Sequence, residues 1–196
     1  MGARAIVEWH QDDNDAPVLI QRNPWLSPST FLPALADFVH AAREGGHAPS
    51  AERFRGWAAE RTPYLLGQDE PRDRMMFLRP GSDVQFHYLI QLDEGHQPAG
   101  RVLRVTAREK EPFRTRVGGR WEITHQATTD DELFELAAGI LRQQAARIRR
   151  LAAEGRGGPM PPADEVAARA ERIRARSSRL SRADGQARAA ARSVTP

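Results

Sequence analysis

TDDELFELAAGILRQQAARIRRLAAE, residues 129–154, carries the strongest local structure signal in this chain of 196 residues. Thr129 followed by Glu132 forms a capping box, in which the hydroxyl and carboxylate oxygens accept hydrogen bonds from backbone N–H groups at a helix start. Acidic residues open the stretch and arginines close it, as the helix dipole favours. Gly155 follows as a terminator. We therefore predict one long α-helix that ends at Gly155.

The same stretch has one apolar face. Its apolar residues recur at spacings of three and four and so form a stripe along the helix, and three further apolar residues lie beside that stripe. The main stripe is Phe134, Ala137, Leu141, Ala145, Ile148 and Ala152, widened by Leu133, Leu136 and Ile140. We expect this face to pack on the protein's own sheet. The alternative is that part of its width receives a partner.

Two shorter helical patterns lie nearer the N-terminus. The first begins at Ser29 or Thr30, either of which can act as the cap, and ends at Gly45. The second begins after Ser50 and ends before Pro63. Their apolar faces are Phe31, Leu35, Phe38 and Ala42 in the first, and Phe54, Trp57 and Ala58 in the second. We predict an N-terminal helical pair.

The region between the helices is typical of β-strands. Residues 84–92 alternate between apolar and polar, and residues 101–108 supply a second strand. Residues 113–117 and 121–125 flank two glycines, and we prefer a three-residue loop that aligns Val117 with Trp121. These runs predict an antiparallel sheet of four to five strands arranged as a meander.

Two short apolar runs near the N-terminus, residues 5–9 and 18–21, are either a pair of strands or extended segments docked on the core. Together with the other elements they predict an α+β fold. It consists of a helical pair, an antiparallel meander sheet and a long amphipathic helix packed on that sheet.

After Gly155 the sequence RGGPMPP is typical of a flexible linker. Residues 163–182 are then expected to be helical, because apolar residues recur there as a weak heptad seam, and the segment beyond is expected to be disordered. We predict an α+β globular domain over residues 1–154 and an arginine-rich extension over residues 155–196. Deletion of residues 157–196 is expected to leave the fold largely intact.

Composition narrows the function classes. The chain has no cysteine, so disulfides, thiolate metal sites and cysteine nucleophiles are excluded. It contains no apolar run long enough for a membrane span, and its first residues turn acidic without the apolar stretch of a secretory signal. We expect no membrane insertion and a cytoplasmic protein.

The charge is unevenly distributed along the chain. The net charge is +3, with an acidic N-terminal third and a basic C-terminal part. Lys110 is the only lysine, so nearly all basic residues are arginine. A GC-rich, bacterial-like composition explains this bias better than selection for guanidinium chemistry does.

Residue patterns for catalysis, metal binding or cofactor binding are sparse. No phosphate-binding glycine loop, zinc-protease motif or serine elbow is present, so no catalytic, metal or cofactor residue is assigned. His87 and His125 could share a sheet face near Asp93, which would form a small enzyme cleft. This is the least favoured of the functions considered.

Two groups of arginines are candidate partner or phosphate contacts. One is a stripe on the C-terminal helical segment, and the other gives an electropositive platform if its members share an exposed sheet face. The stripe is Arg169, Arg172, Arg176 and Arg179, and the platform is Arg104, Arg114 and Arg116. The alternatives are a solvated helix that pairs with another helix, and neutralisation of the platform by glutamates across strands.

These observations favour a non-enzymatic binding or adaptor protein that engages a macromolecular partner through its sheet face or C-terminal helix. A protein partner or helix-mediated self-association is expected. Nucleic-acid association through the arginine-rich extension is the alternative, since clustered positive charge releases counterions from phosphates.

Overall fold

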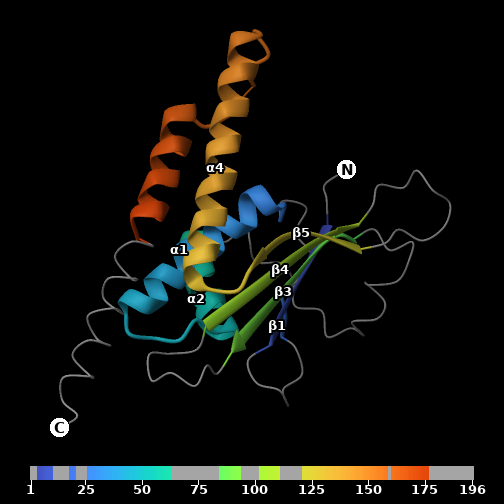
Figure 1. Cartoon of the computed structure of the whole chain (residues 1–196), viewed down its shortest axis with the longest axis vertical. Helices are drawn as coiled ribbons and strands as arrows, with labels where there is room; N and C mark the ends of the chain where they lie inside the picture. Colours follow the sequence, from blue (N-terminus) through green and yellow to red (C-terminus); the bar gives the residue numbers. More distant parts are fainter. Residues whose placement is uncertain are drawn as a thin grey trace, which may run out of the picture.

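A five-stranded mixed sheet carries the helices on one of its faces (Figure 1). The computed structural model describes residues 4–10, 18–20, 26–62, 84–93, 102–110, 121–158 and 160–176. The strands are β1 (Arg4–His10), β2 (Val18–Ile20), β3 (Val84–Asp93), β4 (Val102–Lys110) and β5 (Trp121–Ala127), in the order β2-β1-β3-β4-β5. The α+β class predicted from the sequence is confirmed.

The strand directions correct one part of the prediction. β3, β4 and β5 form the expected antiparallel meander, and the short apolar runs at the N-terminus pair as an antiparallel β1–β2 hairpin. β1, however, lies parallel to β3. A parallel pair needs a long crossover connection, and the helical pair between β2 and β3 lies within that connection. Alternation of apolar residues shows which face is buried but carries no information on strand direction.

The preferred register of the last hairpin stays a prediction. Residues 113–117, with the expected Val117–Trp121 pair, lie outside the described residues. β5 pairs directly with β4, and Ala127 lies opposite Val105. An irregularity next to Ala107 shifts the register, so that Ile123 lies opposite Arg108.

One face of the sheet is buried beneath the helices. It is formed by alternate residues of three strands, as the pleat requires: Ala5, Val7 and Trp9, then Phe86, Tyr88 and Ile90, then Val105 and Ala107. The hydroxyl of Tyr88 donates a hydrogen bond to the carbonyl of Leu26 at 2.7 Å. Burial raises the pKa of Tyr88, and the Glu109 carboxylate adds to this effect.

The predicted helical pair is confirmed as α1 (Pro28–Glu44) and α2 (Ala51–Arg61). Ser50 caps α2, since its hydroxyl accepts a hydrogen bond from the N–H of Arg53. The cap of α1 is Ser27 instead of the expected Ser29 or Thr30. Pro28 explains the earlier start, because its fixed φ suits the first helical position. Four aromatic rings, Trp9, Phe31, Phe38 and Phe54, pack together between these helices and β1.

The long helix α4 (Asp130–Ala153) is the element that residues 129–154 predict. The hydroxyl of Thr129 accepts from the N–H of Glu132 at 3.1 Å, and Glu132 in return accepts from the backbone N–H of Thr128 at 2.6 Å. Gly155 ends the helix with a φ of 67°. Its apolar face packs on α1, β4 and β5, so the expectation that it covers the protein's own sheet is confirmed.

A further helix, residues 163–176, lies beside α4 and is called the C-terminal helix (Figure 1). Val166, Ala170 and Ile173 are buried members of the same core as the sheet and α1. Residues 163–176 of the predicted extension are therefore helical, as expected, but they are packed rather than loosely attached. The domain division at residue 154 stays a prediction, and residues 177–196 lie outside the described part of the chain.

Candidate functional site

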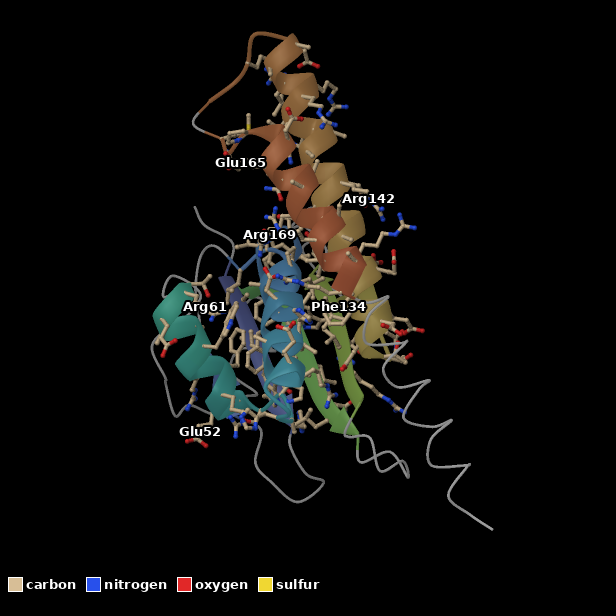
Figure 2. All side chains as sticks on the ribbon, turned by 90° about the vertical axis from the view of Figure 1, so that its left-hand side faces the viewer. Glu52, Arg61, Phe134, Arg142, Glu165 and Arg169 are labelled. Carbon is tan, nitrogen blue, oxygen red and sulfur yellow. The ribbon has the colours of Figure 1, made fainter. Side chains whose placement is uncertain are left out.

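The C-terminal helix forms an open cleft with α1 and α2, which we call the arginine cleft. Its volume is about 350 Å³. Figure 2 shows two of its arginines, Arg61 on α2 and Arg169 on the C-terminal helix. The cleft is lined by Asp37, His40, Ala41 and Glu44 from α1, by Trp57, Arg61 and Thr62 from α2 and its end, and by Arg169, Arg172 and Arg176.

Asp37 binds two of these arginines at once. One carboxylate oxygen accepts from Nε and Nη2 of Arg169 at 3.2 and 2.8 Å, and the other accepts from Nη1 of Arg176. Arg169 and Arg176 lie seven residues apart on one helix, which places them on the same side two turns apart. We call this group the Asp37 clamp. It fixes two guanidinium groups side by side with a single carboxylate to neutralise them.

Two further arginines of the cleft make no ion pair with any other described residue. The guanidinium of Arg61 lies over the ring of Trp57, 5.9 Å from its centroid, in a cation–π arrangement. Arg172 is exposed on the C-terminal helix. The second carboxylate of the cleft, Glu44, lies 3.2 Å from Nε2 of His40. Four guanidinium groups therefore face two carboxylates, which leaves an excess of two positive charges.

The other arginines of α4 and the C-terminal helix have a different environment. Most of them are matched with a carboxylate on their own or the neighbouring helix. These pairs are Arg142–Glu171, Arg149–Asp164, Arg150–Glu154 and Arg174–Glu135. Arg147 is the exception, since it has no carboxylate partner among the described residues. In the arginine cleft, four described arginines face two carboxylates.

The wall of the cleft contains two buried hydrogen-bond donors. Nε1 of Trp57 and Oγ1 of Thr62 have no hydrogen-bond partner among the described residues. Both atoms are covered by their neighbours, so they do not reach a group held in the open part of the cleft. The arginines are therefore the residues expected to contact such a group directly.

The sequence-predicted contacts are only partly brought together. Arg169, Arg172 and Arg176 meet in the arginine cleft. Arg104 is exposed on β4, on the sheet face opposite the buried Val105. The remaining three candidates, Arg114, Arg116 and Arg179, lie outside the described residues. The platform on the sheet face therefore stays a prediction, and Arg104 is its one member among the described residues.

Sequence reasoning missed Arg61 and Asp37. Asp37 is separated from Arg169 by 132 residues, so no local spacing connects them. The sequence offers one signal: Asp37 is an acidic residue of α1 that lies next to the apolar residue Phe38. An acidic residue beside an apolar face indicates a basic partner but does not identify that partner.

The two histidines considered for catalysis do not share a sheet face. His125 lies opposite Ala107, whereas His87 lies opposite Arg108, the next residue of β4, and successive residues of a strand face opposite ways. Burial lowers the pKa of His125, and the Glu109 carboxylate opposes this shift. The side chain of Asp93 is outside the described part. The shared sheet face that was the least favoured alternative is therefore not formed by these two histidines.

His87 instead contacts a buried carboxylate. Glu8 on β1 is fully buried, with one oxygen 3.3 Å from Nε2 of His87 and the other 3.5 Å from Nε2 of His10. In the described ranges no group of three or more histidine, aspartate or glutamate residues has an arrangement that could hold a metal ion. We interpret this cluster as a buried polar contact between β1 and β3.

Comparisons of this chain with protein-family models, with curated proteins and with solved structures found no match. The helices that the structure describes include none with the length and apolar character of a membrane span.

Proposed function

We propose that the protein is a non-enzymatic binding protein that engages an acidic partner through the arginine cleft. One observation carries this proposal: four guanidinium groups converge there against two carboxylates. Guanidinium groups bind and orient anions by charge-assisted hydrogen bonds, but they do not exchange protons at neutral pH. The site therefore suits recognition better than acid–base catalysis.

The arrangement favours a localised acidic group over a nucleic-acid backbone. A phosphate backbone is bound by cations that follow it over a distance, and each contact adds to the salt dependence of binding. Along α4 and the C-terminal helix, most described arginines outside the cleft are paired with carboxylates. Nucleic-acid association stays the alternative and is tested in the same experiment.

The test compares two double variants that remove the same charge. Arg61→Ala/Arg172→Ala removes the two cleft arginines that have no carboxylate partner among the described residues. Arg147→Ala/Arg150→Ala removes two exposed arginines of α4 outside the cleft. Binding of a fluorescent oligoglutamate peptide and of a labelled DNA duplex is followed by anisotropy across a salt series.

The proposal predicts that the peptide binds the unchanged protein and the α4 variant similarly, and that the cleft variant loses about tenfold or more in affinity. Equal losses in both variants would show that only net charge matters. Peptide binding that is absent from all three proteins would refute the proposal. Tighter binding to DNA than to the peptide, with equal losses in both variants, would support the nucleic-acid alternative instead.

A further inference from the structure

We infer that the group held in the arginine cleft is a phosphate monoester, and that it bridges Arg61 on α2 and Arg172 on the C-terminal helix. This inference rests on the proposed function and names the chemistry of its ligand. It starts from the charge of the site, where the arginines exceed the carboxylates by two.

The charge of the cleft favours a phosphate monoester as its ligand. A phosphate monoester carries about 1.5 to 2 negative charges at neutral pH, whereas a carboxylate or a phosphodiester carries only one. A monoester therefore neutralises the excess of two positive charges in the cleft. A singly charged group would leave one guanidinium without a counter-charge.

Part of the site is already organised before a ligand binds. The Asp37 clamp holds Arg169 and Arg176 in place, yet Asp37 uses only some of the N–H donors that each guanidinium carries. The side chains of these two arginines remain 38% and 30% exposed. Because they are positioned before the ligand arrives, binding needs to order only Arg61 and Arg172, which lowers its entropic cost.

The size of the cleft also suits a phosphate group. A volume of about 350 Å³ lies near the lower end of the range for small-molecule sites. The cleft is also open, so it accommodates a charged group with the rest of its molecule outside. Two sources supply this chemistry: a small phosphorylated metabolite, and a phosphorylated serine or threonine side chain in a partner protein.

The two arginines that would bind the phosphate come from different helices. Arg61 belongs to α2, and Arg172 belongs to the C-terminal helix. A phosphate bonded to both connects these elements across the cleft. Binding is then expected to raise the melting temperature of the unchanged protein, because a ligand that binds only the folded state stabilises it.

The experiment is isothermal titration calorimetry on the full chain with matched probes. A phosphoserine peptide is compared with the same peptide carrying glutamate, with phenyl phosphate, and with diethyl phosphate as a singly charged diester. The variants Arg61→Ala and Arg172→Ala are compared with Arg147→Ala, whose side chain is exposed and outside the cleft. Circular dichroism melts establish that each variant is folded.

We expect the phosphoserine peptide to bind about tenfold or more tightly than the glutamate peptide, and each cleft variant to lose about tenfold. Phenyl phosphate that matches the peptide supports a small-molecule source, and phenyl phosphate that binds much more weakly supports a phosphorylated protein.

If glutamate or diethyl phosphate binds as tightly as the phosphate monoester with the same dependence on Arg61 and Arg172, the monoester inference is wrong but the proposed function stands. If no probe binds, or if Arg147→Ala is as damaging as the cleft variants, both proposals fail.

Discussion

We predict that the stability contributed by the Asp37 clamp depends on the burial of the carboxylate and not on the length of its ion pairs. Asparagine at position 37 keeps the shape and the similar helix propensity of aspartate but removes the charge that two guanidinium groups share. The matched control is Asp164→Asn, because Asp164 also lies 2.8 Å from an arginine, Arg149. The side chain of Asp37 is 24% exposed, whereas that of Asp164 is 92% exposed.

The expected free energies follow from this difference in exposure. Hydrogen bonds to charged groups contribute about 1.5–3 kcal/mol when buried, and exposed ion pairs contribute about 0–1 kcal/mol. The partners of Asp37 are about one-third exposed, so each of its two arginine contacts is expected to contribute about 1 kcal/mol instead of the full buried value. We expect Asp37→Asn to lose about 2 kcal/mol and Asp164→Asn to lose less than about 1 kcal/mol, even with its favourable place in the first turn of a helix.

Urea denaturation followed by far-UV circular dichroism measures both values, and a thermal melt gives a second reading. For a chain of this size, about 2 kcal/mol corresponds to a decrease of roughly 4–8 °C in the melting temperature. Equal losses for Asp37→Asn and Asp164→Asn would refute the reasoning. In that case the C-terminal helix would be held by its apolar residues alone.

Three other substitutions and one control test the packing and capping. Ile173→Ala, at a side chain that is 1% exposed, should lose about 2–5 kcal/mol in urea denaturation, whereas Met160→Ala, at 36% exposed, should lose less than about 0.5 kcal/mol. Leu141→Asp should abolish cooperative melting, because an unpaired carboxylate would be buried. Hydrogen bonds from Thr128 lower the pKa of Glu132, so Glu132→Gln should destabilise the protein near neutral pH, and the deficit should vanish as the pH falls through that lowered pKa. These assignments would be contradicted if the stability deficit of Glu132→Gln did not depend on pH. They would also be contradicted if Leu141→Asp melted cooperatively, or if Ile173→Ala left the free energy of unfolding unchanged.

The features that the sequence predicted correctly are those that neighbouring residues determine. The cap at Thr129, the glycine at 155 and the apolar spacing between them define α4 within one stretch. Alternation defines β3 and β4 for the same reason. The parallel pairing of β1 with β3 joins residues far apart in the chain, and neither strand carries a local sign of its partner.

The C-terminal helix shows where composition misled the prediction. Its linker is rich in glycine and proline and was expected to be flexible, yet a short linker also lets two helices pack as an antiparallel pair. Val166, Ala170 and Ile173 did indicate an apolar seam, and the structure shows that α1 and α4 belong to the core that buries it. The half of the cleft contributed by Asp37 and Arg61 could not be found, because only the folded chain brings these residues to the arginine stripe.

The central claim is that the arginine cleft binds an anionic group, and nitrogen-15 NMR of the arginine Nε–H groups tests it most directly. The signals are assigned with single Arg→Lys variants and followed while the full chain is titrated with phenyl phosphate. The account predicts that Arg61, Arg169, Arg172 and Arg176 shift together with one dissociation constant, while Arg147 and Arg150 stay unchanged. Small shifts spread over all arginines, or shifts that avoid the cleft, would contradict it.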